Sequence, residues 1–253
     1  LVTKLYETNL HRVLFSGQPL TDAHIQYIVW QAFRALRYLH RAHVIHRDIK
    51  PTNILLNRDC ELCLADLGLA RYTGPPSDVA TQALQRHRSD LNMDSPQAQE
   101  KRHGTSMTKY VVTRWYRAPE LLVQNSSYGS AVDMWSIGCI LAEVVAQKAL
   151  FPGKDSLQQL KFIIELIGPP TEDEMDLITN QQAANFVRGL KGKYVDQTLP
   201  TTLAAILPQA SPELVDLIAK LLRFNPAERL SADECLHHPY LKAYHDAIYE
   251  EEI

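Results

Sequence analysis

Three polar side chains in one short segment are of types that can assist the transfer of a phosphoryl group. They lie in residues 46–53, which read HRDIKPTN. Asp48 can accept a hydrogen bond from a substrate hydroxyl and aim it for in-line attack. Lys50 lies two residues on and can reach the transferring phosphate, because alternate residues of an extended segment point the same way. Asn53 can give an oxygen ligand to magnesium, which prefers hard oxygen donors.

Two further motifs follow in a fixed order. Residues 66–68 read DLG, where Asp66 is a second oxygen ligand for magnesium, and residues 118–120 read APE. Each of these residue types is common in loops, so any one motif alone would carry little weight. The three together, in this order and at this spacing, resemble the catalytic machinery of the protein kinases.

The resemblance narrows to the mitogen-activated protein kinases and covers nearly the whole chain except residues 73–107. It is carried by VVTRWYRAPE at 111–120, YG at 128–129, DMWSIGC at 133–139, FPGK at 151–154, a helical stretch at 169–193, FNP at 224–226 and HPYL at 238–241. It implies a serine/threonine kinase that uses ATP and Mg²⁺ and prefers proline after the target residue, with Arg117 shaping the pocket for that proline. The implied partners are protein substrates with Ser/Thr-Pro sites, an upstream dual-specificity kinase and docking-motif proteins.

The same resemblance assigns roles to residues outside the catalytic loop. Thr113 is implied to hydrogen-bond near Asp48 and Lys50. For the nucleotide, the implied residues are the gatekeeper Thr3, the hinge residues Leu5 and Tyr6, Asn9 where an aspartate commonly contacts the ribose, and Leu55 under the adenine ring.

A regulatory role is implied for the Thr-x-Tyr motif at residues 108–110, whose middle residue is an unusual lysine. Phosphate on Thr108 is expected to meet Arg47 and Arg71. Phosphate on Tyr110 is expected to meet Arg114 and Arg117, because guanidinium groups bind phosphate in a bidentate manner.

Several residues are expected to support these groups. Asp133 should anchor the backbone of the catalytic loop, and Glu120 should form a structural ion pair with Arg229. Leu67 replaces the commoner phenylalanine and is expected to fill the same apolar slot. The acidic residues Asp246 and Glu250 to Glu252 fit a partial docking site about as well as a solvated charged tail.

We expect a mainly α fold, the C-terminal lobe of the protein-kinase fold, as a helical bundle with short β-hairpins and without the N-terminal β lobe. Residues 1–8 are expected to be a hinge remnant and residues 9–253 the lobe, with a disordered insertion at 73–107 that is poor in apolar residues. Apolar periodicity predicts a helix that Thr21 caps, a central buried helix around 132–145, and helices over 156–167 and from Ser211-Pro212 onward. Short strands are expected at 53–56 and 61–65.

The sequence contains no G-x-G-x-x-G loop, and its only lysines before Asp66 are Lys4 and Lys50. Two interpretations follow. The chain is an incomplete piece of an active kinase, inactive by itself, or it is a non-enzymatic binding module that docks partners between the Thr21 helix and the turn near Cys60. A binding module has no physical need for the complete catalytic set, which favours the first interpretation.

Composition limits the class of protein further. The chain has 253 residues, 45% of them hydrophobic, and a net charge of −3 that argues against nucleic acid as the main partner. No apolar run approaches the roughly 20 residues that span a bilayer, so no membrane partner is expected. Four cysteines favour a reducing compartment, cytoplasmic or nuclear, and we interpret Cys60 and Cys63 as ordinary hairpin residues rather than as a metal or redox pair.

Overall fold

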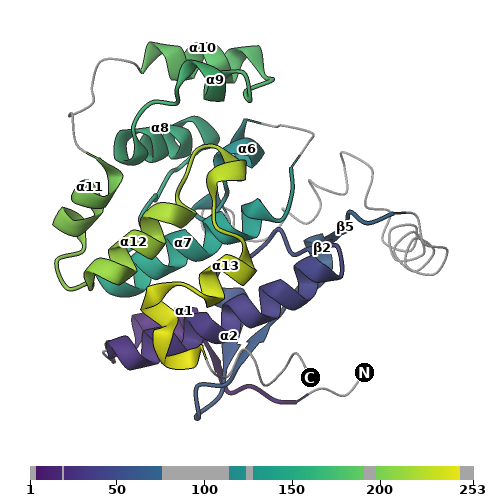
Figure 1. Ribbon diagram of the computed structural model, residues 1–253, viewed down its shortest axis with the longest axis vertical. Helices are drawn as coiled ribbons and strands as arrows, with labels where there is room; N and C mark the ends of the chain where they lie inside the picture. The colour runs from purple at the N-terminus through teal and green to yellow at the C-terminus, as the bar shows by residue number, and fades with distance from the viewer. Residues whose placement is uncertain (1–3, 19, 76–113, 124–127, 191–197, 246–253) are drawn as a thin grey trace.

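The computed structural model describes residues 4–18, 20–75, 114–123, 128–190 and 198–245. Its described elements are mostly helices, and the strands are two or three residues long (Figure 1). The strands are β1 (Thr8–Asn9), β2 (Val44–Ile45), β3 (Ile54–Leu56), β4 (Leu62–Leu64) and β5 (Arg71–Tyr72). The helices are α1 (Leu10–Phe15), α2 (Asp22–Arg41), α6 (Pro119–Leu122), α7 (Ala131–Ala146), α8 (Ser156–Ile167), α9 (Glu172–Met175), α10 (Gln181–Gly189), α11 (Leu199–Ile206), α12 (Pro212–Leu221) and α13 (Ala232–Leu236). Four 3₁₀ turns complete the list: η1 (Pro51–Asn53), η2 (Leu67–Leu69), η3 (Pro226–Glu228) and η4 (Pro239–Tyr244).

Helix α7 is the centre of the core, as its apolar sequence predicts. Thirteen of its 16 residues are buried, so it presents almost no face to solvent. Gly138 lets α12 approach closely, since a Cβ there would lie only 3.0 Å from side-chain atoms of Leu221 and Leu222. The predicted central helix and the helix that opens at Ser211 are therefore both confirmed, packed side by side (Figure 1).

Helix α2 supports the catalytic loop from the other side. The side chain of Thr21 accepts a hydrogen bond from the backbone N–H of His24, and the His24 ring accepts one from the Thr21 N–H, which fixes the first turn. The predicted apolar stripe is buried from Ile25 to Leu36. Helix α2 also contacts α13 and the hairpin strand β4, so it joins the hairpin to the C-terminal helices.

The short strands place the chemically important segments next to one another. The antiparallel sheet of order β1-β3-β4 sets Asn9 opposite Leu55 and Leu55 opposite Cys63. A second pair, β2 with β5, sets Ile45 opposite Arg71. Residues 46–53 run from the second sheet to the first, so strand pairing fixes both ends of the catalytic loop.

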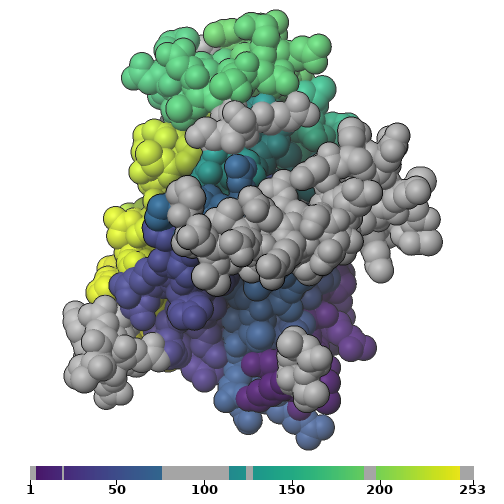
Figure 2. All heavy atoms as spheres, turned by 90° about the vertical axis from the view of Figure 1, so that its right-hand side faces the viewer, coloured from purple at the N-terminus to yellow at the C-terminus, as the bar shows by residue number. Residues whose placement is uncertain are grey.

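Helices α8 to α10 form one end of the molecule. In the space-filling view, the green residues around 160–190 gather at that end, and the blue and purple residues of the first 70 positions gather at the opposite end (Figure 2). A second apolar cluster lies beneath these helices, with Leu160, Ile164, Met175 and Val187 buried in it. Among the described helices none is both long and apolar enough to cross a membrane.

Candidate active site

The predicted catalytic side chains of residues 46–53 meet in one place. Lys50 Nζ lies 2.6 Å from Asp48 Oδ2, and Asn53 Nδ2 donates to the same oxygen at 3.2 Å and to the Asp48 carbonyl at 2.9 Å. Asp48 and Asn53 are 8% and 7% exposed, so the carboxylate is held in a nearly buried frame. Both of these side-chain contacts use Asp48 Oδ2, so within the described part of the chain Oδ1 is left for an incoming donor.

Asp133 holds the backbone of this loop, as the sequence predicts. Its Oδ2 accepts a hydrogen bond from the His46 N–H at 2.9 Å, and its Oδ1 accepts one from the Arg47 N–H at 2.8 Å. His40 Nε2 lies 2.9 Å from Oδ2, and the Asp133 side chain is fully buried. Arg47 has a φ of 68°, a left-handed conformation that persists in a non-glycine residue only where the surroundings fix it. The paired hydrogen bonds from α7 supply that constraint.

His46 connects the catalytic loop to the metal motif. Its Nε2 lies 3.0 Å from the carbonyl of Ala65, and its Nδ1 accepts from the Asp48 N–H at 3.4 Å. A carbonyl can only accept, so Nε2 carries the proton and Nδ1 is the acceptor. The ring is fully buried, and it ties the residue before Asp66 to the backbone of Asp48.

The residues that could hold magnesium lie on adjoining segments. The Ala65 N–H donates to the Asn53 carbonyl at 2.9 Å, which brings Asp66 next to the end of the catalytic loop. The Asn53 amide nitrogen faces Asp48, so its amide oxygen points elsewhere and can face a cation. Asp66 is exposed and has φ 65° and ψ 68°, and its Oδ1 accepts a hydrogen bond from the Gly68 N–H at 3.3 Å. Both residues therefore fit the hard oxygen donors that Mg²⁺ prefers.

The expectation for Leu67 is wrong. Its side chain is 53% exposed, so it fills no apolar slot among the described residues. Leu67 follows the left-handed Asp66 in the 3₁₀ turn η2, and neither apolar cluster of the described residues includes it. Residue type indicated an apolar partner, but the described chain provides none.

Of the expected nucleotide residues, Leu5 and Tyr6 precede strand β1, and Asn9 on β1 pairs with Leu55 on β3. Leu5 is 82% exposed, Tyr6 is half-buried, and Asn9 lies opposite Leu55 in the sheet. The Asn9 side chain caps α1 by accepting from the Arg12 N–H at 2.9 Å, a structural role that its sequence position did not reveal. Lys4 adds an ion pair to Glu61 on the facing hairpin.

All four of the predicted phosphate-binding arginines lie among the described residues. Arg47 and Arg71 both lie over the ring of Tyr128, with guanidinium carbons 5.1 and 5.7 Å from its centroid. Desolvation lowers the pKa of Arg117, nearby Asp48 opposes this, and Arg114 and Arg47 lower the pKa further. Arg47 and Arg71 therefore share one aromatic ring, and positive charges clustered in this way favour a nearby anion.

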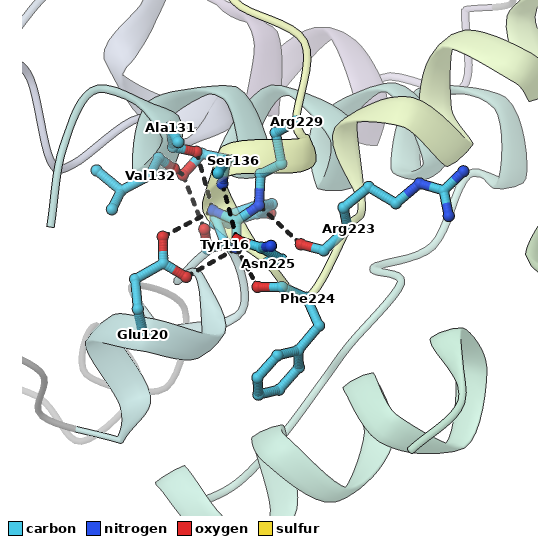
Figure 3. A network of polar contacts seen from close by, with 10 residues as sticks. Tyr116, Glu120, Ala131, Val132, Ser136, Arg223, Phe224, Asn225 and Arg229 are labelled. Atoms are coloured by element: carbon cyan, nitrogen blue, oxygen red, sulfur yellow. Dashed lines mark hydrogen bonds and ion pairs between the residues drawn. The ribbon is translucent and has the colours of Figure 1, made fainter. Parts of the chain in front are cut away.

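The end of the predicted activation segment is held by a buried ion pair, also as predicted. Arg229 Nη1 and Nη2 donate to the two carboxylate oxygens of Glu120 at 2.7 and 2.8 Å (Figure 3). The remaining donors reach the backbone carbonyls of Arg223, Phe224 and Ala131 at 2.8, 3.0 and 3.1 Å. All five N–H groups are satisfied, and the guanidinium also lies over the Trp135 ring.

A small pocket opens between this segment and Asp48. Its lining includes Asp48, Tyr116, Arg117, Leu121 and Val132. The Tyr116 hydroxyl donates to buried Glu143 at 2.6 Å, and Ser136 donates to the Tyr116 carbonyl at 2.8 Å (Figure 3 shows the latter pair). Burial raises the pKa of Glu143 although the Tyr116 hydrogen bond opposes it.

Several predicted residues cannot be placed. Thr3, Thr113, Thr108, Tyr110 and the acidic tail from Asp246 lie outside the described residues, as does most of the predicted insertion. Other supporting residues had no predicted role. His46 and Tyr128 belong to the motifs but were assigned no contact, and His40, Glu143 and Gln159 were not singled out. Gln159 is fully buried and bonds Trp115 and Gly153, and a lone glutamine on a helix gives no sequence signal for such a role.

Comparison with known proteins settles the family. The profile of the protein kinase domain matches residues 1–241. The chain belongs to the protein kinase family. It is 42% identical over 97% of its length to mitogen-activated protein kinase 5 of rice, 44% over 98% to mitogen-activated protein kinase spk1 of Schizosaccharomyces pombe, and 43% over its whole length to mitogen-activated protein kinase 4 of Arabidopsis thaliana. The resemblance to the mitogen-activated protein kinases is thus confirmed.

The match covers this kinase chain almost entirely but its relatives only in part. The chain spans 58% of the length of each of these three curated relatives, and 41% of extracellular signal-regulated kinase 1 of Dictyostelium discoideum.

Proposed function

We propose that this chain is part of a proline-directed serine/threonine kinase of the mitogen-activated type. The reaction is transfer of the ATP γ-phosphate to a Ser or Thr hydroxyl that proline follows. The observation that carries the proposal is the Asp48 carboxylate, held by Lys50 at 2.6 Å and Asn53 at 3.2 Å in a nearly buried frame. The kinase relatives support the same reaction.

Each side chain in the frame has a distinct part in the chemistry. Asp48 accepts the hydrogen bond of the substrate hydroxyl and takes its proton as the oxygen attacks the γ-phosphorus. The bond to the bridging oxygen breaks, and ADP leaves with that electron pair. Lys50 places a positive charge beside the transferring phosphoryl group, where negative charge is spread over three oxygens. Magnesium, held by Asn53 and Asp66, would neutralise phosphate charge when bound.

The preference for proline is proposed to depend on the pocket beside Asp48. The pocket combines the apolar side chains of Leu121 and Val132 with the guanidinium of Arg117 at its rim. Its position next to the catalytic carboxylate suits the residue immediately after the phosphorylated one. Glu143 and Ser136 hold Tyr116 in the wall, so the pocket shape is set by buried hydrogen bonds.

We further propose that the described elements are the C-terminal lobe of the protein-kinase fold, with residues 1–8 as the hinge. Support comes from the helical core around α7 and from the Asn9–Leu55 edge, where the adenine is expected. Activation is proposed to require phosphate on Thr108 and Tyr110. The proposed source of the positive charge that such phosphates need is Arg47 and Arg71, which share the Tyr128 ring, together with Arg114 and Arg117.

The proposed roles of Asp48 and Asp66 are tested by paired substitutions in the protein expressed from its complete gene and activated by an upstream kinase. Asp48→Asn should lower turnover of a Thr-Pro peptide by about 10³-fold or more while leaving ATP affinity nearly unchanged, because Asp48 faces the hydroxyl. Asp66→Asn should instead weaken Mg·ATP binding, because it removes the charge of a metal ligand. Asp59→Asn, on the exposed hairpin turn, is the matched control and should change neither quantity.

Calorimetry with magnesium present separates the possible outcomes. Equal Mg·ATP affinities for Asp48→Asn and Asp66→Asn would contradict the assigned roles. A wild-type protein that binds docking peptides but shows no turnover would favour the binding-module interpretation over the kinase.

A further inference from the structure

The ring of Tyr128 contacts two of the four arginines, Arg47 and Arg71. The guanidinium of Arg47 lies 5.1 Å from the ring centroid and that of Arg71 lies 5.7 Å from it. Arg71 Nη1 also donates to the Tyr128 hydroxyl at 3.2 Å. One half-buried aromatic side chain therefore contacts both positive charges.

Three different segments bring these residues together. Arg71 lies on β5 and is paired with Ile45 of β2. Ile45 comes two residues before Arg47. The backbone of Arg47 is fixed in its left-handed conformation by the hydrogen bond from its N–H to Asp133. Tyr128 comes just before α7, the helix that carries Asp133. The arrangement thus rests on the same rigid helix that holds the catalytic loop.

Two guanidinium groups this close repel each other unless something compensates for their charge. The ion pairs of the described residues include no carboxylate partner for Arg47 or Arg71. The negative face of an aromatic ring attracts a cation placed over it. A guanidinium that lies over a ring keeps its in-plane N–H groups free, and only one of Arg71's is used by the Tyr128 hydroxyl. Within the described ranges no other side-chain hydrogen bond uses the edges of the two groups, so an anion can approach them there.

We propose that Tyr128 is a positioning residue that holds Arg47 and Arg71 as a pair ready to bind a phosphomonoester dianion. This role rests on the proposed function, in which phosphate on Thr108 meets these two arginines. Tyr128 does not touch the substrate, and it acts through the orientation of the guanidinium groups.

The test is phosphorus NMR of the complete protein carrying phosphate on Thr108, titrated between pH 4 and 9. A free phosphothreonine has a second pKa near about 6. In the wild-type protein the arginine pair should lower that pKa by about one unit, because opposite charges favour the dianion. Tyr128→Leu should restore about half of the difference, and Tyr128→Phe, which keeps the ring, should retain most of it. A merely structural role would not produce this difference between matched variants of similar thermal stability.

The outcomes separate failure of this role from failure of the proposed function. If the wild-type phosphothreonine titrates like the free amino acid and Arg71→Ala changes nothing, the arginine pair does not bind the phosphate. If Arg71→Ala raises the pKa but Tyr128→Leu leaves it at the wild-type value, the pair binds phosphate without help from Tyr128. Should Tyr128→Leu fail to fold, Tyr128→Met gives the same comparison without a ring.

A second arm identifies the source of the anion. In Thr108→Ala protein, inorganic phosphate is the probe, and its binding is followed by the change in melting temperature. Weaker binding to Tyr128→Leu than to Tyr128→Phe, by about fivefold, would support the positioning role for phosphate from solution too. Equal binding of inorganic phosphate to the two variants would contradict the positioning role of Tyr128 for phosphate from solution.

Discussion

The catalytic loop and the metal-binding turn are neighbours with very different support. In the loop, Asp48 is 8% exposed, and the backbone amides of His46 and Arg47 both donate to the buried carboxylate of Asp133. In the turn, Asp66 is exposed, its carboxylate accepts one amide at 3.3 Å, and Leu67 is 53% exposed. The two segments meet at Asn53, whose carbonyl accepts the N–H of Ala65.

The difference shows how firmly the described residues hold each proposed part of the chemistry. Asp48, proposed to aim the substrate hydroxyl, follows a backbone segment that Asp133 of α7 holds through two hydrogen bonds. Asp66, proposed to bind the metal, lies in an exposed turn with few contacts among the described residues. Local stability varies within one structure in this way, and functional turns are drawn from the less stable part.

The largest effect is expected at Asp133. Asp133→Ala would leave two buried N–H groups and the His40 ring without their partner. The free energy of unfolding should fall by about 3–5 kcal/mol, and by roughly half of that in Asp133→Asn, which keeps one acceptor oxygen. Urea unfolding with an unchanged slope measures both values.

The control for Asp133 is Asp155→Ala. Asp155 also accepts a backbone N–H, that of Gln158, but it is an exposed helix cap, so its loss should be about 1 kcal/mol. If Asp133→Ala lowered the free energy of unfolding no more than Asp155→Ala, the catalytic loop would be held by something other than α7.

A pH-dependent effect of intermediate size is expected at Glu143. Burial raises the pKa of this carboxyl above its usual value of 4.5, against the opposing hydrogen bond from Tyr116. The folded protein therefore keeps the proton to higher pH than the unfolded chain, and stability falls as the pH rises above about 4.5 through the raised pKa. Each pKa unit corresponds to about 1.4 kcal/mol.

Glu143→Gln keeps an acceptor for the Tyr116 hydroxyl and has no titrating group. Its unfolding free energy, measured between pH 4 and 8, should therefore lose the part of the pH dependence that wild type shows above pH 4.5. Parallel pH profiles for the two proteins would show that Glu143 does not titrate differently on folding.

The smallest effect is expected in the metal-binding turn. Leu67→Ala should cost less than about 0.5 kcal/mol, because the side chain is largely exposed. Leu56→Ala is the buried comparison, at 3% exposure on β3, and should cost about 2–5 kcal/mol. If the two alanine substitutions lowered the free energy of unfolding equally, in thermal or urea unfolding, the turn would be no less well packed than β3 and the contrast would be wrong.

Sequence alone predicted the elements that repeat a pattern and the ion pairs that belong to a motif. The stripe of α2 and the apolar α7 follow from residue type and spacing, the Glu120–Arg229 pair follows from the family resemblance, and the structure confirms all three. The prediction that Leu67 fills an apolar slot was wrong, because burial depends on residues far away in sequence, which a local pattern does not contain.

The roles of His46 and Tyr128 were missed for a similar reason. The ring contacts of these two residues join segments 19 or more positions apart, and residue type alone does not predict such a contact.

Native-state hydrogen exchange on the full 253-residue chain tests the central contrast most directly. The amides of His46 and Arg47, bonded to Asp133, should exchange only through near-global unfolding, whereas the Gly68 amide should exchange through a local opening at least about 2 kcal/mol lower in free energy. Protection of Gly68 equal to that of His46 and Arg47 would contradict the account, because the metal-binding turn would then be as firmly held as the catalytic loop.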